Sequence, residues 1–135
     1  MANIKRIDHV AIVVDDIQTA LAFWQDALGL DLSRVENVTE EHAQVAFLPA
    51  GGPEIELVKP TTDDSGLARF LEKHGPGMHH VCLEVEDLEG MLASLKLKGV
   101  QLINETPLIG TSGKKYAFIH PKSAGGVMVE LYEVR

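Results

Sequence analysis

The sequence predicts an α+β fold in which two tandem copies of a strand–helix–three-strand unit make up one domain spanning residues 1–135. Two pairs of segments carry this prediction. HVCLEVEDL (80–88) resembles HVAIVVDDI (9–17), and VELY (129–132) resembles IELV (55–58). Between them, a helical stripe ended by glycine and a further strand recur in the same order. Two unrelated α+β halves would have to produce these ordered matches by chance, so an internal repeat is the better explanation.

The first copy, approximately residues 4–60, opens with IDHVAIVV (7–14), whose β-branched residues predict a strand. Asp15 or Asp16 can cap a following helix, in which apolar residues recur at helical spacing until Gly29. The remaining elements are expected to be short strands at 31–37, 42–49 and 54–59, a hairpin break at PAGGP (49–53) and a connecting helix at approximately 65–74.

The second copy, approximately residues 76–135, repeats this order at a nearly constant spacing. A helical stripe begins at Leu88, a strand follows at Tyr116 and a hairpin break begins at Pro121. The offset is 71 residues from His9 to His80, 70 from Gly29 to Gly99 and 74 from Glu56 to Glu130. Such regular spacing indicates that equivalent residues of the two copies occupy equivalent places in the fold.

The composition is that of an ordinary globular protein, with 45% hydrophobic and 24% charged residues. A formal net charge of −8 argues against a general surface for nucleic acid or anionic membranes. No stretch approaches the roughly 20 apolar residues of a membrane span. The short apolar run near the start contains Asp8 and His9, which favours a strand over a signal peptide. The single cysteine, Cys82, excludes an intramolecular disulfide and fits a reducing compartment, so a cytoplasmic location is expected.

The repeat pairs polar residues within otherwise apolar strands: His9 with His80, and Glu56 with Glu130. A buried carboxylate is unfavourable unless it is paired or binds a metal. Imidazole and carboxylate ligands together suit divalent ions such as Zn, Ni, Co, Fe or Mn. Each of these residues alone is more often structural than a ligand. The symmetric set of four favours a metal site.

His79 and His80 stand side by side in GMHHVCLEV (77–85), and adjacent side chains of a strand point to opposite faces. Only one of the two can therefore face a given site. The repeat selects His80, because it is the residue equivalent to His9. His79 is expected to pack elsewhere or to lie at the surface, and the other histidines, His42, His74 and His120, are expected near loops or strand ends.

Over essentially its whole length the chain resembles the vicinal oxygen chelate superfamily, whose domains pair βαβββ modules in a curved mixed sheet around a divalent metal (the glyoxalase fold). Within it, the closest likeness is to the methylmalonyl-CoA epimerase family. The resemblance rests on IDHVAIVV, VAFLP, EIELVKP, FLEKHGPGMHHVCLEV, GVQLINETP and HPKSAGGVMVEL. The most specific of these are GMHHV and HPKSAGGVMVEL.

This resemblance implies one divalent metal ion per chain, with the ligands His9, Glu56, His80 and Glu130. Co2+ is the expected ion, and Mn2+, Ni2+, Zn2+ and Mg2+ are the alternatives. The resemblance further implies a small-molecule acyl-CoA substrate and a homodimer in which each chain holds a complete site. No nucleic-acid or membrane partner is expected.

The implied reaction inverts C2 of methylmalonyl-CoA by removing and returning a proton through an enolate that the metal stabilises. Inversion requires a base on each face of the substrate. Glu130 is one expected base. Some members carry the other base as a glutamate on the third strand, where this chain has Gln44, an amide that cannot titrate. We therefore expect Glu56 to serve, each glutamate releasing the metal to carry a proton. The alternative is that Glu56 is only a ligand and that water or another group delivers the second proton.

Gln44 and Lys115 are candidate substrate-binding residues, since the offset of 71 maps one onto the other. A lysine in an otherwise acidic chain can attract the substrate carboxylate or a CoA phosphate. The alternative for Lys115 is a solvated position in the GKK turn.

Three other functions of the superfamily remain open at this point. A glyoxalase I (lactoylglutathione lyase)-type isomerase would use the same four ligands. An extradiol dioxygenase would need two histidines and one carboxylate on iron, which leaves the fourth ligand unexplained. A non-catalytic small-molecule-binding member, of the bleomycin-binding type, would need a crevice but no metal ligands.

Overall fold

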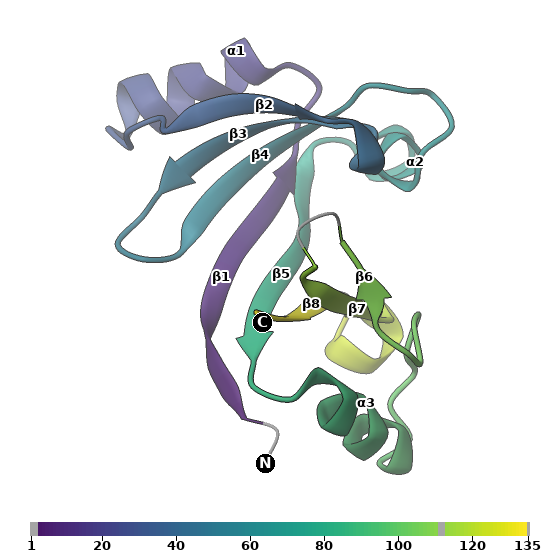
Figure 1. Cartoon of the computed structure of the whole chain (residues 1–135). Coiled ribbons are helices and arrows are strands. Elements are labelled where there is room, and N and C mark those ends of the chain that lie inside the picture. Colours follow the sequence, from purple (N-terminus) through teal and green to yellow (C-terminus); the bar gives the residue numbers. More distant parts are fainter. Residues whose placement is uncertain (1–2, 111–112, 135) are drawn as a thin grey trace. The chain divides into compact units, whose positions relative to one another are not determined.

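The computed structural model of the chain describes residues 3–110 and 113–134, so the outer limits of the predicted domain lie outside the described residues. It consists of two compact units (Figure 1). The N-terminal unit is His9–His79, and the C-terminal unit combines Met1–Asp8 with His80–Arg135. In the part of the chain that the structure describes, no helix is long and apolar enough to cross a membrane.

The N-terminal unit contains one βαβββ module and a connecting helix. Its sheet has the strand order β2-β3-β4-β1, in which β1 is parallel to β4 and the other pairs are antiparallel. The elements are β1 (Ile4–Val13), α1 (Ile17–Leu21), which continues as a π-helical turn over Ala22–Ala27, β2 (Arg34–Val38), β3 (Ala43–Pro49), β4 (Glu54–Pro60) and α2 (Gly66–His74). The first residues of β1, up to Asp8, belong to the other unit.

The C-terminal unit repeats the module with the strand order β5-β8-β7-β6, in which β5 is parallel to β8. Its elements are β5 (Gly77–Val85), α3 (Leu88–Leu97), β6 (Leu108–Ile109), β7 (Lys115–Ile119) and β8 (Met128–Glu133). The two predicted copies therefore fold as two βαβββ modules. Equivalent strands pair in the same order and the same sense.

The first helices of the two modules begin in the same way. Asp16 accepts a hydrogen bond from the backbone N–H of Thr19 at 2.8 Å, and Asp87 accepts one from that of Gly90 at 3.0 Å. Such caps satisfy N–H groups that have no partner within the helix. The chain leaves these helices at Gly29 and Gly99, whose φ angles of 96° and 81° are accessible mainly to glycine.

The second strand begins at Arg34, not at residue 31 as the sequence predicted. The backbone N–H of Leu30 donates to the carbonyl of Trp24 at 3.1 Å, which closes the end of the helical segment. Leu30 and Leu32 then pack against the α1 core instead of entering the sheet. Hydrophobic contact with the helix thus overrides the strand propensity of these residues.

Each sheet has one face covered by a helix. In the N-terminal unit the α1 core contains Ile17, Leu21, Ala46, Leu48 and Leu57, and Figure 1 shows α1 lying along this face. In the C-terminal unit the α3 core contains Leu88, Leu92, Ala117, Ile119 and Leu131. We call the other face of each sheet the glutamate face, because Glu56 and Glu130 lie on it between core-facing neighbours.

Candidate functional site

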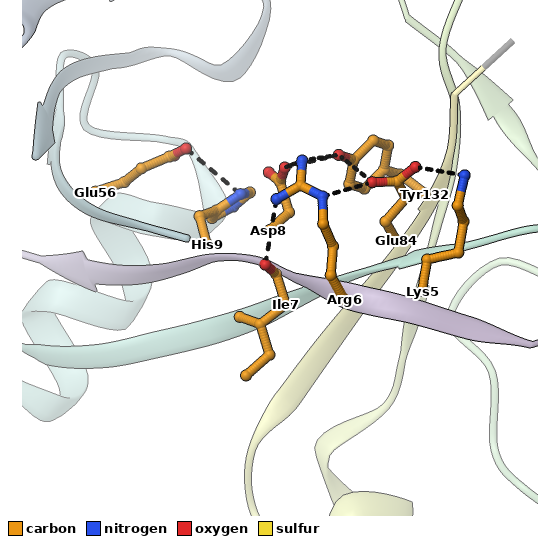
Figure 2. A network of polar contacts seen from close by, with 8 residues as sticks. All are labelled: Lys5, Arg6, Ile7, Asp8, His9, Glu56, Glu84 and Tyr132. Atoms are coloured by element: carbon orange, nitrogen blue, oxygen red, sulfur yellow. Dashed lines mark hydrogen bonds and ion pairs between the residues drawn. The ribbon is translucent and has the colours of Figure 1, made fainter. Parts of the chain in front are cut away.

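The N-terminal unit brings His9 and Glu56 together on its glutamate face. Nδ1 of His9 lies 3.4 Å from Oε2 of Glu56, and Figure 2 shows the carboxylate directed at the imidazole. The strand register explains this contact: Glu56 lies opposite Ala11, two residues after His9 on the same face of β1. Both side chains are largely buried, with 9% and 16% of their surface exposed.

The C-terminal unit brings His80 and Glu130 together in the same way. Nε2 of His80 lies 3.2 Å from Oε1 of Glu130, and the side chains are 14% and 12% exposed. Glu130 lies opposite Cys82, again two residues after the histidine. The structure thus builds two equivalent histidine–glutamate pairs, one within each module.

Aromatic rings adjoin both glutamates. Phe47 lies opposite Glu56 in the register of β3 and β4, and Phe118 lies opposite Glu130 in that of β7 and β8. The Phe118 ring also meets His80 edge-on, with 6.1 Å between the ring centroids. Apolar neighbours of this kind lower the local dielectric, in which the electrostatic interactions of a carboxylate are stronger than in water.

The donor atoms of each pair suit a divalent metal ion. Two ligand atoms that each lie about 2.1 Å from one ion are about 3 Å apart when they occupy adjacent positions. The nitrogen–oxygen distances of 3.4 Å and 3.2 Å are close to that separation. The imidazole nitrogen and carboxylate oxygen within each pair are donor types that Zn, Co, Ni, Fe and Mn accept.

The structure places Gln44 and Lys115 on the opposite faces of their strands from the two glutamates. Gln44 alternates with Val45, which packs on the glutamate face, and lies opposite Lys59 in β4. Lys115 is two residues before Ala117, a member of the α3 core. The offset of 71 shows only that the two residues are equivalent. Their strand face follows from the alternation of side chains: Gln44 lies three residues before Phe47 and Lys115 three residues before Phe118, and an odd separation places side chains on opposite faces.

Two cations that sequence reasoning missed do lie on the glutamate faces. The Arg34 guanidinium lies over the Phe47 ring, 3.9 Å from its centroid, and the Lys114 ammonium lies over the Tyr132 ring at 4.4 Å. Such stacking is the usual geometry of a cation–π contact. Strand alternation was the signal in the sequence. Each cation lies an even number of residues from another residue of the glutamate face along the same run of chain.

His79, unlike His80, belongs to the α2 side of the N-terminal unit. Its ring meets Phe70 edge-on at 4.9 Å between centroids, and Phe70 in turn contacts His74 at 4.8 Å. His79 therefore packs against α2, as expected for the histidine of the doublet that is not the candidate ligand. His120 caps a short 3-10 turn by accepting a hydrogen bond from the backbone N–H of Lys122 at 3.0 Å.

A polar network around the buried residues Glu84 and Tyr132, which sequence reasoning also missed, adjoins the second pair in the C-terminal unit. We call it the Tyr132 network; its members are Lys5, Arg6, Asp8, Glu84 and Tyr132 (Figure 2). The Tyr132 hydroxyl donates to Oδ1 of Asp8 at 2.6 Å, and Nε of Arg6 donates to Oε1 of Glu84 at 2.8 Å. Arg6 also donates to Asp8 at 3.0 Å, while Lys5 lies 3.3 Å from Glu84.

The network shifts the ionisation of Arg6, Glu84 and Tyr132, and the hydrogen bond to Glu84 raises the pKa of the Arg6 guanidinium. Burial raises the pKa of the Tyr132 hydroxyl, and the hydrogen bond to Asp8 raises it further. Burial would also raise the pKa of the Glu84 carboxyl, but the hydrogen bonds from Lys5 and Arg6 outweigh it, so that this pKa is lowered. The network therefore consists of a neutral hydroxyl that donates and of charged groups that are mutually paired.

Comparison with known proteins identifies a family and several relatives. The Glyoxalase/Bleomycin resistance protein/Dioxygenase superfamily matches residues 8–118. The chain is 40% identical over 130 residues to the mitochondrial methylmalonyl-CoA epimerase of Homo sapiens, covering 96% of this chain and 74% of the human protein.

Two solved structures are similar in both sequence and fold. Methylmalonyl-CoA epimerase from Mycobacterium tuberculosis is 37% identical with a TM-score of 0.84, covering 98% of this chain and 89% of that chain. A variant of Streptomyces coelicolor methylmalonyl-CoA epimerase in complex with 2-nitronate-propionyl-CoA is 30% identical with a TM-score of 0.84, covering 97% of this chain and 95% of that chain.

Proposed function

The chain belongs to the Glyoxalase/Bleomycin resistance protein/Dioxygenase superfamily, and from that membership we propose that it is an enzyme that epimerises methylmalonyl-CoA at C2. The observation that carries this proposal is the pair of equivalent histidine–glutamate contacts in a chain similar along nearly its whole length to epimerases of that substrate. The acyl-CoA analogue in the Streptomyces coelicolor protein supports the substrate class.

The proposed ligands of one divalent ion per chain are His9, Glu56, His80 and Glu130. Co2+ is the first candidate ion, and Mn2+, Ni2+, Zn2+ and Mg2+ are the alternatives. Two carboxylates would balance the charge of such an ion, and four protein ligands would leave positions for substrate oxygens. When bound, the ion would supply Lewis acidity that stabilises the negative charge which develops on the thioester carbonyl oxygen.

Glu130 and Glu56 are the proposed bases. One glutamate, as the carboxylate, takes the C2 proton from one face of the substrate, and the other, as the protonated acid, gives its proton to the opposite face. The configuration inverts and the two glutamates exchange protonation states, which are reset by proton exchange between turnovers. The adjoining Phe118 and Phe47 rings limit water around each carboxylate. Exclusion of water favours transfer between glutamate and carbon over exchange with solvent.

Arg34 and Lys114 are the proposed contacts for the anionic groups of the acyl-CoA. Both cations lie on glutamate faces, and each is oriented by stacking on an aromatic ring. A local cation is needed because the chain as a whole carries a net charge of −8. A cytoplasmic location, which rests on the single cysteine, and a homodimer with a complete site in each chain, which rests on the family resemblance, complete the proposal.

The decisive experiment is deuterium wash-in at C2 of methylmalonyl-CoA in D2O, with and without a metal chelator. The expected result is exchange with inversion, which the chelator abolishes and Co2+ restores. Formation of lactoylglutathione from the glutathione hemithioacetal without C2 exchange would replace the proposal with a glyoxalase I-type function. A purified chain with almost no bound metal, and with no exchange after Co2+ is added, would favour a non-catalytic binding protein.

Glu56→Gln and Glu130→Gln separate the roles of the two glutamates, because an amide can still donate an oxygen ligand but cannot accept the C2 proton. Each variant is expected to retain bound metal and to lose inversion. Unchanged turnover of Glu56→Gln with metal bound would remove Glu56 from the proton transfer. The second proton would then have to come from water or another group.

A further inference from the structure

The two modules differ in one row of cross-strand neighbours next to the glutamates. In the N-terminal unit the row after Ala11–Glu56–Phe47 is Val13–Val58–Val45. In the C-terminal unit the row after Cys82–Glu130–Phe118 is Glu84–Tyr132–Tyr116. The strand registers of the two modules correspond residue for residue here. The same place in the fold therefore holds three valines in one module and polar residues in the other.

The valine row shows that the module itself does not need polar residues at this place. Val13, Val45 and Val58 are at most 5% exposed, and Val45 and Val58 pack in an apolar cluster with Ala11 and Ala43. Such packing stabilises a sheet without any hydrogen-bonding partner. Apolar residues are therefore sufficient for folding at this place in one module. The polar residues at the equivalent place in the other module require a further explanation.

The polar row in the C-terminal unit carries a desolvation penalty. Glu84 is 6% exposed and Tyr132 is 4% exposed. Burial of a charge and a hydroxyl is tolerated only with complete pairing, and a buried ion pair is often no more stabilising than apolar residues of the same volume. Arg6, Lys5 and Asp8 provide that pairing from the N-terminal half of β1. Residues of a second strand, β1, thus hold Tyr132 of β8 and its neighbour Glu84 in place.

Tyr132 is the member of the network that lies on the same strand as Glu130. It follows Glu130 by two residues on the same face of β8, and its hydroxyl is held at the far end by Asp8 at 2.6 Å. The Lys114 ammonium covers the ring at 4.4 Å. A ring fixed at both its face and its hydroxyl is a rigid neighbour, whereas the equivalent neighbour of Glu56 is the short side chain of Val58.

We propose that Tyr132, held through Asp8, Arg6 and Glu84, is a positioning residue that keeps the Glu130 carboxylate turned toward His80. The fixed ring occupies the space into which the carboxylate would otherwise rotate along β8. Glu130 is thereby presented to a metal ion in one orientation. The equivalent place beside Glu56 holds Val58, so the two symmetry-related glutamates have different neighbours along their strands. This inference rests on the proposed metal-binding role of Glu130.

The test measures Co2+ affinity by competition with a chromophoric chelator, together with kcat, KM and thermal unfolding. Tyr132→Phe keeps the ring but removes the hydroxyl, and it is expected to weaken Co2+ binding and lower kcat by about 10-fold with KM unchanged. Asp8→Ala should reproduce this loss. Asp8→Asn should restore affinity toward the wild-type value, because its amide oxygen still accepts from the Tyr132 hydroxyl.

The control is Leu92→Ala in the α3 core, which destabilises the same unit from the other face of the sheet. Leu92→Ala should lower the melting temperature without changing Co2+ affinity. The inference is overturned if Tyr132→Phe and Asp8→Ala change affinity no more than Leu92→Ala does. It is also overturned if Asp8→Asn is as impaired as Asp8→Ala.

The affinity measurement does not depend on which reaction the chain catalyses. A wild-type chain that binds Co2+ but exchanges no proton at C2 would refute the proposed epimerase function alone. The Tyr132→Phe comparison would then still decide the positioning role. A wild-type chain that exchanges the proton while Tyr132→Phe binds Co2+ normally would refute only the positioning role.

Discussion

Glu130 lies directly opposite Cys82 in the parallel register of β5 and β8, as Glu56 lies opposite Ala11 in that of β1 and β4. Because the equivalent residue is alanine, Cys82→Ala is expected to fold, with a free energy of unfolding lower by about 1 kcal/mol for the lost sulfur contacts. Urea unfolding measures this loss. Cys82 is fully buried, so its thiol should react with a thiol reagent only on unfolding. Equal reaction rates in native and unfolded protein would contradict this burial.

The histidine doublet gives a matched pair of variants. His79→Ala removes an edge contact with Phe70 and should lower the free energy of unfolding by about 1 kcal/mol while Co2+ affinity is retained. His80→Ala removes the partner of Glu130 and should weaken Co2+ binding by more than about 100-fold, beyond the usual effect of a residue outside the ligand shell. A competition titration measures the Co2+ affinity of both variants, and urea unfolding measures the free energy of unfolding. Equal affinities for the two variants would contradict the assignment.

The lowered pKa of Glu84 predicts acid-dependent stability. A carboxyl whose pKa is lower in the folded chain than its ordinary value of 4.5 stabilises the fold above about that pH, and the contribution is lost as the pH falls through the folded-state value. Glu84→Gln should therefore be less stable than wild type at pH 7, and the difference should shrink between pH 4.5 and pH 3. Urea unfolding at each pH measures it.

The control for this pH series is Glu105→Gln, which breaks an exposed ion pair with Lys96 on the same unit. An exposed pair contributes little to stability, so this variant should follow wild type at every pH. A Glu84→Gln difference that stays constant from pH 7 to pH 3 would show that the carboxylate charge does not stabilise the fold.

The positions of Gln44 and Lys115 on the helix-covered faces predict that neither affects substrate binding. Gln44→Ala and Lys115→Ala should leave KM for methylmalonyl-CoA within about two-fold of wild type, as is usual for contacts that the substrate does not make. Arg34→Ala and Lys114→Ala should raise KM, because each removes a cation from a glutamate face. Steady-state kinetics on the four variants compares them directly. The opposite pattern would move the acyl-CoA contact to the other face.

Most of the fold could be read from the sequence because the repeat supplies an internal comparison. The spacing from His9 to His80 identified equivalent strands, and the structure confirms two βαβββ modules with matching registers. The beginning of β2 was misplaced, since packing of Leu30 and Leu32 on the helix is a tertiary effect that strand propensity does not contain. The two-residue strand β6 was not located, because so short a segment has no periodicity to detect.

The residues themselves determined which side chains are equivalent: His9 with His80, and Glu56 with Glu130. Internal similarity is a property of the sequence. The pleat of a strand lets only one histidine of the doublet face a given site, and the repeat makes His80, not His79, the candidate ligand. Only the tertiary structure decided which residues share a face with the glutamates. The folded structure places Gln44 and Lys115 on the strand faces opposite the glutamates. It places Arg34 and Lys114 on the glutamate faces, each beside an aromatic ring.

The Tyr132 network shows why this second step needs the folded chain. Its members come from distant parts of the sequence, and Asp8 and Tyr132 are 124 residues apart. In an apolar strand pattern Glu84 and Tyr132 read as isolated exceptions, and nothing local relates them to Lys5 or Arg6. Their pairing depends on the N-terminal half of β1 joining the C-terminal unit. Only long-range strand pairing, which sequence spacing does not encode, brings these charges together.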